Sequence, residues 1–253
     1  MFNIAINTFK EIVRNKFLYL ILVFAFAFIV FSILLGKLTI GDDSKVIVDF
    51  GLAMIEIFSL LWVLFVWSQL LFKEIEWKTI FLILSKPIKR YEFIIGKFLG
   101  FSATIFLIIL VQSLLFLSVL AIKDIEITQM IAYSLWFTFL KMETLLALVF
   151  FFSTFMSNML TVVVSLMVYF LSHNFGNLID MALRSKNIVF EYFAKILNLI
   201  FPPFEAMNIK DYIGSFENFT THFYLMNSFY GIAYTAIIIY LTVLIFNRKK
   251  FEI

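Results

Sequence analysis

Long apolar runs dominate the chain and recur at intervals that suit helices crossing a lipid bilayer. A membrane-spanning helix needs about 20 consecutive, mostly apolar residues. Six runs come close to this length, and the stretches between them carry most of the charged residues. The pattern therefore predicts an all-α membrane protein in which residues 1–253 form a single transmembrane domain. We place its six transmembrane helices at about residues 17–35, 50–72, 98–122, 129–152, 159–179 and 226–246.

A shorter amphipathic stretch precedes the first run. At helical spacing, residues 2–16 have one apolar face and one face of asparagine and charged residues. A helix of this kind lies in the membrane interface. The apolar run behind it continues to Leu35 without the small-residue cleavage site of a signal peptide, so we expect the first span to be retained. The apolar face consists of Phe2, Ala5, Ile6, Phe9 and Val13.

The longest stretch between predicted spans is residues 180–225. Within it, apolar residues recur at helical spacing from Val189 to Ile200, and Pro202 and Pro203 end the pattern because proline cannot continue a helix. This helix is too short to cross a bilayer. We expect an outer-face helical segment between the fifth and sixth spans, lying on the outer leaflet.

Basic residues are unevenly distributed between the two sets of loops. Twelve lysines and arginines lie in residues 1–16, 73–97 and 247–253, against seven in residues 36–49, 123–128 and 180–225. Lys and Arg concentrate in loops on the cytoplasmic side. We therefore expect a multi-pass protein of the cytoplasmic (inner) membrane, with both termini and the 73–97 loop in the cytoplasm.

The composition argues against most kinds of catalytic chemistry. The chain is 63% hydrophobic and has no cysteine, which excludes disulfides, thiol nucleophiles and cysteine-ligated metals. A metal site formed by His173 and His222 with Glu205 or Asp211 is one interpretation, and two ordinary interfacial histidines are the one we favour. For this chain we expect no catalytic residue, no bound metal or cofactor and no nucleic-acid partner.

The sequence also lacks a nucleotide-binding P-loop. That motif needs G-x-x-x-x-G-K followed by Ser or Thr, so that backbone amides surround the phosphates. Ahead of Gly36-Lys37 the first glycine is replaced by Phe31, and ahead of Gly96-Lys97 by Tyr91. If ATP drives this protein, another chain must hydrolyse it.

Three charged residues fall inside predicted spans: Glu56, Lys141 and Glu143. Charges at such positions usually pair or line a wet cavity. Lys141 and Glu143 are two residues apart and point to different sides of a helix, so we predict that Lys141 pairs with Glu56 instead. Glu143 then reaches a second copy of the chain or is protonated. Whether these charges contact a substrate or only fix the packing stays open.

The predicted cytoplasmic loop, residues 73–97, has the pattern helix, break, helix. Its first part suits a helix, Ser85-Lys86-Pro87 breaks it, and the chain restarts from Ile88 toward the third span. Gly96 and Gly100 then form a G-x-x-x-G spacing that lets two membrane helices approach closely. A charged loop that merely follows the charge rule above is the simpler alternative.

Short motifs lie along nearly the whole chain in a characteristic order. They are Asp49-Phe50-Gly51-Leu52, Lys73-Glu74-Ile75-Glu76, Lys78-Thr79, Leu84-Ser85-Lys86-Pro87-Ile88, Arg90-Tyr91-Glu92, Gly96-Lys97-Phe98-Leu99-Gly100, Phe152-Ser153-Thr154-Phe155, Tyr169-Phe170-Leu171-Ser172-His173, Phe201-Pro202-Pro203-Phe204-Glu205 and Asn208-Ile209-Lys210. With these motifs the chain resembles permeases of the type-2 ABC exporter class (ABC-2 family). It is most similar to the branch that contains the permease for maturation of nitrous oxide reductase, a copper enzyme.

The resemblance implies a coupling helix after the second span that docks into a separate ABC-type ATP-binding subunit, which holds ATP and Mg. It also implies a homodimer of permeases and leaves room for an outer-face partner on residues 180–225. The substrate is not implied, because related scaffolds export lipids, glycans, peptides and drugs. A membrane anchor or assembly scaffold without a transport path is the alternative. The coupling residues implied are Glu74, Glu76, Lys78, Thr79, Leu84, Ser85, Lys86, Pro87 and Arg90.

Overall fold

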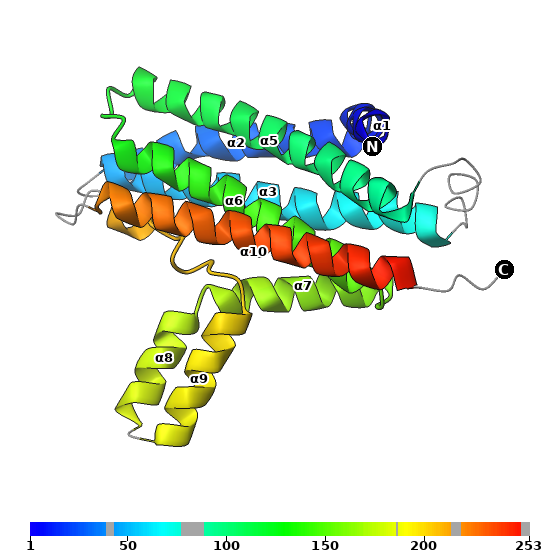
Figure 1. Ribbon diagram of the computed structural model, residues 1–253. Helices are drawn as coiled ribbons and strands as arrows, with labels where there is room; N and C mark the ends of the chain where they lie inside the picture. Colours follow the sequence, from blue (N-terminus) through cyan, green and yellow to red (C-terminus); the bar gives the residue numbers. More distant parts are fainter. Residues whose placement is uncertain (39–42, 77–88, 186, 214–218, 249–253) are drawn as a thin grey trace.

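The computed structural model describes residues 1–38, 43–76, 89–185, 187–213 and 219–248, and these form an all-α protein (Figure 1). Apart from one short 3-10 helix, the elements in this part of the chain are α-helices joined by short connections. They are α1 (Phe2–Val13), α2 (Lys16–Leu38), α3 (Asp43–Glu76), α5 (Arg90–Ile122), α6 (Gln129–Ser153), α7 (Asn158–Ser172), α8 (Phe175–Arg184), α9 (Ile188–Ile200), η1 (Lys210–Tyr212) and α10 (Thr221–Arg248).

Five of the described helices, α2, α3, α5, α6 and α10, are long and apolar enough to cross a membrane. Helices α7 and α8, taken together, are also long and apolar enough to cross a membrane, although the pair is bent by 55°. The prediction of an all-α, multi-pass membrane protein is therefore confirmed, with five straight spans and one bent candidate for the sixth.

The span predicted over residues 159–179 is not one continuous helix, because the chain breaks at His173 and Asn174 between α7 and α8. Two side chains explain the break. The Asn174 side-chain amide donates to the Phe170 carbonyl over 2.8 Å, and Nδ1 of His173 lies 2.9 Å from the Tyr169 carbonyl. Such local bonds compete with the helical pattern. With 15 residues, α7 is only about 22 Å long at the helical rise, short of the roughly 30 Å of hydrocarbon.

Helix α1 and the end of α10 lie at the same end of the helical bundle (Figure 1). There the Arg90 guanidinium donates to the carbonyl of Asn247 over 3.2 Å, and the Phe93 ring stacks on Phe246. We call this the terminal end, and the end with the α5–α6 turn the opposite end. The six spans predicted from the sequence are an even number, and an even number of crossings places both termini on one side of the membrane.

Helix α6 forms the centre of the bundle. Every residue from Leu140 to Phe150 is buried, and α6 contacts α3, α5, α7 and α10. By contrast, α2 and α10 expose many large apolar side chains on their outer surfaces. The central position of α6 puts its two charged residues, Lys141 and Glu143, inside the protein.

Helix α1 packs across the start of α5, where the two glycines of the G-x-x-x-G spacing lie. A Cβ atom on Gly96 would lie 2.9 Å from the Met1 carbonyl, and one on Gly100 would lie 2.7 Å from Cβ of Thr8. The predicted close approach is present, but its partner is the interfacial helix and not a second span. The buried residues of α1 are Thr8 and Ile12, whereas Phe2 is exposed, so the predicted apolar face is not the packed one.

Helix α9 matches the helix predicted before Pro202 and Pro203, and it forms a hairpin with α8 that projects from the side of the bundle (Figure 1). The hydroxyl of Tyr234 on α10 donates to the carbonyl of Ile200 over 2.9 Å, which fixes the end of α9 against the bundle. The hairpin exposes large apolar side chains, and its position on the outer leaflet stays a prediction.

The outer-face position of residues 180–225 stays a prediction, but one part of this stretch is packed within the bundle. After α9, residues 201–213 run back into the bundle, and we call them the inserted segment. Phe204, Met207 and Ile209 are 0%, 1% and 2% exposed and belong to the hydrophobic core. Lys210 also forms an ion pair with Glu56 on α3. The segment therefore has a polar anchor in addition to the apolar anchor that its buried side chains provide.

Candidate functional site

The carboxylate of Glu56, midway along α3, is the centre of a buried cluster of polar side chains. Its Oε1 atom accepts a hydrogen bond from the Lys141 ammonium group of α6. Both side chains are almost fully buried, at 5% and 2% exposed. The ion pair predicted between Glu56 and Lys141 is therefore present, and it links two helices that are 85 residues apart in sequence.

Helix α7 contributes two further groups from consecutive turns of one face. The Tyr169 hydroxyl donates to Oε1 of Glu56 over 2.6 Å, and Nε2 of His173 lies 3.3 Å from the same oxygen. Nδ1 of His173 faces the Tyr169 carbonyl, which can only accept, so Nδ1 carries a proton. Nε2 is not aligned for a hydrogen bond in this arrangement and contacts the carboxylate at closer than 4 Å.

The inserted segment supplies the last partner. Lys210, the first residue of η1, donates to Oε2 of Glu56 over 2.9 Å, and its side chain is a quarter exposed. The next residue, Asp211, accepts a bond from the Asn208 amide over 3.2 Å. One carboxylate therefore joins three helices to a segment that is 154 residues away from it in sequence.

The hydrogen bonds and ion pairs of this arrangement stabilise the buried charges. A buried ion is stable only when it is paired and its remaining hydrogen-bonding positions are filled. Glu56 accepts hydrogen bonds from Lys141 and Tyr169 on one oxygen and from Lys210 on the other. We call Glu56, Lys141, Tyr169, His173 and Lys210 the Glu56 cluster.

Three members of this cluster were not predicted from the sequence. Tyr169 and His173, the residue that follows α7, are four residues apart and so lie on one helical face. This spacing could have predicted that both contact the same partner. Lys210 had no such signal, because nothing in its local sequence indicates that the segment turns back into the bundle.

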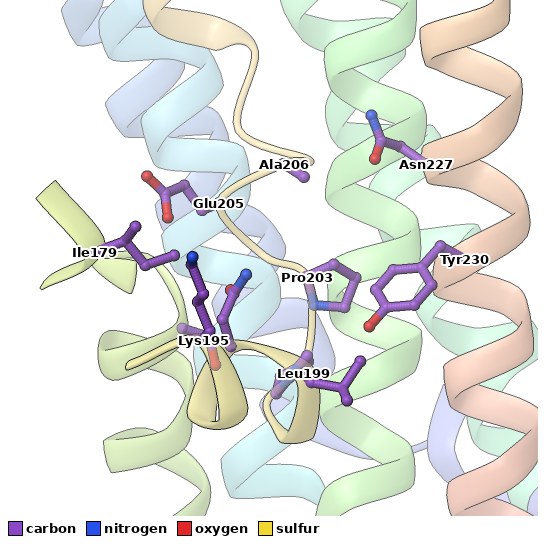
Figure 2. A pocket seen from close by; sticks show the side chains of 11 residues that line it. Ile179, Lys195, Leu199, Pro203, Glu205, Ala206, Asn227 and Tyr230 are labelled. Atoms are coloured by element: carbon purple, nitrogen blue, oxygen red, sulfur yellow. The ribbon is translucent and has the colours of Figure 1, made fainter. Parts of the chain in front are cut away.

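A pocket of about 490 Å³ lies beside the inserted segment, between the α8–α9 hairpin and α10. Figure 2 shows Lys195 and Glu205 on one side of it and Asn227 and Tyr230 on the other. Glu205 is held in place because the backbone N–H of Gly176, at the start of α8, donates to its carboxylate. Lys195 is bonded to Glu191 over 2.5 Å on the exposed face of α9, and this bond raises the pKa of Lys195. The two charged residues that line this pocket, Lys195 and Glu205, thus already have partners.

The third predicted intramembrane charge, Glu143, is not part of the Glu56 cluster. It points to another side of α6 and is 7% exposed, with a hydrogen bond to Ser102 of α5. Its Oε1 atom has no hydrogen-bond partner among the described residues. The prediction that Lys141 and Glu143 do not pair is confirmed.

Most of the implied coupling residues cannot be placed. Lys78, Thr79, Leu84, Ser85, Lys86 and Pro87 lie outside the described residues. Glu74 and Glu76 belong to α3, which runs without a break through the predicted start of the loop, and their side chains are also outside the described part. Arg90 begins α5 at the terminal end and binds Asn247.

No group of three or more metal-ligating side chains is found among the described residues. The predicted alternative of a metal site that joins the two histidines receives no support, since His173 faces Glu56 while His222 lies exposed in the first turn of α10.

Comparison with protein-family models and with curated proteins gives no match for this chain.

Proposed function

We propose that this chain is the permease subunit of an ATP-driven exporter of the type-2 ABC class, with ATP hydrolysed by a separate subunit that docks on residues 73–92. The observation that carries the proposal is the inserted segment. Irregular backbone at membrane depth is tolerated only where protein buries it or where it lines a water-filled cavity, and transporters use it at their substrate paths. A plain membrane anchor has no need of such a segment.

The Glu56 cluster acts in this proposal as a latch on the inserted segment. The bond between Lys210 and Glu56 is its partly exposed side, while Lys141 and Tyr169 hold Glu56 from the buried side. When water replaces the bond from Lys210, the segment loses its polar anchor and is held only by its apolar side chains, while the buried pair of Glu56 and Lys141 stays intact. The segment then moves between a closed and an open position beside the pocket of Figure 2.

Helix α3 supplies a mechanical link between the latch and the docking side. It is continuous from Asp43 to Glu76, and the part from Glu56 to Glu76 measures about 30 Å at the helical rise. A push on the terminal end of α3 by an ATPase subunit therefore displaces Glu56 as part of the same rigid helix. The resemblance of residues 73–100 to the ABC-2 pattern supports docking at this end.

The decisive test is co-purification with a soluble ATPase, followed by measurement of ATP hydrolysis in the complex. We expect Glu74→Lys with Glu76→Lys to abolish the change in ATPase activity on complex formation while the protein still inserts in the membrane. Glu126→Lys, an exposed charge at the opposite end, is the matched control and leaves the activity unchanged. A protein isolated without any ATPase partner favours the scaffold alternative and contradicts the proposal.

A second test follows the latch itself. The chain has no cysteine, so Ala206→Cys provides a single thiol in the inserted segment, on the wall of the pocket. We expect its reaction rate with a water-soluble maleimide to change several-fold on addition of ATP to the complex, and Lys210→Met to remove most of that change. A constant rate in all states would show that the segment is only structural.

A further inference from the structure

A second cavity lies between α5, α6 and α10, on the side of α6 that faces away from the Glu56 cluster. It has a volume of about 650 Å³, within the range of small-molecule sites. Its floor is formed by buried side chains of α6, Leu140 and Glu143, and its rim by exposed ones, including Trp136 and Tyr240. We call it the α5–α10 groove.

The groove is reached from the lipid and not from water. Its walls are residues 91–102 of α5 and 232–243 of α10, each about 16 Å long at the helical rise, and both belong to helices that can cross the membrane. Apart from Glu143, Ser102 and Thr235, the lining side chains are apolar or aromatic. A ligand therefore has to be mainly apolar and to partition into the bilayer first.

Glu143 gives the groove one site of strong polarity. Its side chain is more than nine-tenths buried, Ser102 provides one hydrogen bond, and Oε1 has no partner among the described residues. No lysine, arginine or histidine is among the described side chains that line the groove. A carboxyl group in such surroundings favours a ligand that brings a proton donor or a positive charge.

A second copy of the chain is a poor source of that charge. The one lysine or arginine inside the predicted spans is Lys141, and it is 2% exposed and already bound to Glu56. A neighbouring protomer therefore offers no free lysine or arginine from its predicted spans. A small basic molecule does not have this restriction.

We propose that the α5–α10 groove binds a hydrophobic amine, an apolar molecule with a single basic nitrogen that pairs with Glu143 while its hydrocarbon part lies along α5 and α10. The inference does not depend on the transport proposal, because it concerns binding to this chain alone.

Trp136 on the rim serves as a built-in reporter, with its indole N–H bonded to the Ser228 hydroxyl over 3.0 Å. The probe is a primary alkylamine with a bromine at the end of its chain, since bromine quenches indole fluorescence on contact. The matched probe is the bromoalkyl alcohol of the same length. Both are titrated into the full chain in lipid nanodiscs, and Trp136→Phe identifies the part of the signal that comes from the groove.

We expect saturable quenching of Trp136 by the amine at a concentration about tenfold lower than by the alcohol, the range of one charge-assisted hydrogen bond. Glu143→Gln should bring the amine to the affinity of the alcohol. The matched control is Glu126→Gln, an exposed carboxylate far from the groove, and it should leave the difference intact.

A variant that fills the groove provides a second test, in case Glu143→Gln fails to fold. Ala236→Phe places a ring against the groove wall and should abolish saturable quenching by both probes. Equal affinities of the two probes for the unmodified chain would overturn the proposal, as would an amine preference that survives Glu143→Gln. Quenching that Ala236→Phe does not change would show that the probes only dissolve in the bilayer.

Discussion

At the scale of single residues, the main feature is the number of groups that share the Glu56 carboxylate. Lys141, Tyr169 and Lys210 all donate to it, and it has only two oxygens to receive them. Removal of the carboxylate therefore takes the Glu56 counter-ion away from both ammonium groups. Removal of either lysine still leaves Glu56 paired with the other lysine. The cost of each substitution follows from this asymmetry and from the burial of the group left behind.

The first prediction concerns which of these substitutions lowers the free energy of unfolding most. Glu56→Gln should lower the free energy of unfolding by about 3–5 kcal/mol, the range for breaking a buried ion pair. Lys210→Met should cost less, about 1–2 kcal/mol, because the Lys210 side chain is a quarter exposed and water replaces part of its bond. Thermal unfolding of the purified protein in one detergent, with Lys195→Met as an exposed control, gives the comparison.

A double substitution tests whether the cost comes from the unpaired lysine. Glu56→Gln combined with Lys141→Met removes both buried charges and should recover part of the stability lost in Glu56→Gln alone. Strictly additive losses would contradict a direct interaction between the two residues.

The role of Lys141 in function is a separate prediction. If the Glu56 cluster serves transport, Lys141→Met should assemble with the ATPase subunit at normal yield and lose most of its transport. The measurement is transport by reconstituted complex relative to the amount of folded permease. Loss of the folded protein, in place of loss of transport, would assign the pair a purely structural role.

At the scale of elements, the contact between α1 and α5 depends on two missing side chains. Cβ atoms on Gly96 and Gly100 would lie under 3.0 Å from the backbone of α1, which is closer than real Cβ atoms approach. Glycine at these positions thus lets an interfacial helix lie directly on the backbone of a spanning helix. The small residues that favour packing between spans are used here for a different pair of elements.

Gly100→Leu should separate α1 from α5 while the rest of the bundle remains folded. Overpacking of this kind costs about 1–3 kcal/mol. Amide hydrogen exchange of residues 4–12 should increase by an order of magnitude or more, since the helix loses its buried face at Thr8 and Ile12. Leu114→Ala, on the exposed face of α5, is the control. Unchanged exchange in α1 would show that the contact adds nothing to its stability.

At the scale of the whole molecule, the orientation in the membrane follows from the distribution of basic residues. The terminal end holds the N-terminus, the start of α5 and the end of α10, and these stretches are rich in Lys and Arg. The positive-inside rule then predicts that this end faces the cytoplasm.

Single cysteines test the orientation without background, because the chain has none of its own. We expect an impermeant maleimide added to intact cells to label Glu126→Cys at the opposite end and not Asn3→Cys on α1. Both positions are exposed, and both should react after the membrane is permeabilised. The reverse pattern would refute the predicted topology.

Much of the fold could be read from the sequence, because a spanning helix is recognised from its own residues. The structure has helices at all six predicted runs, and the helix before Pro202 is also where it was expected. Local signals were misread where side chains compete with the backbone, as at His173 and Asn174. The pair of Glu56 with Lys141 was predicted because few partners exist at that depth, whereas Lys210 was not.

The sequence by itself determined that this is an all-α membrane protein, roughly where its helices lie and that its intramembrane charges need partners. The tertiary structure decided which helix is central, since α10 and α6 are both apolar enough to span a membrane although α6 is mostly buried and α10 mostly exposed. The physical reason is that lipid and protein neighbours are equally apolar, so periodicity cannot distinguish a lipid-facing surface from a packed one. Only contacts between distant residues bring the inserted segment to Glu56 and leave Glu143 in a groove of its own.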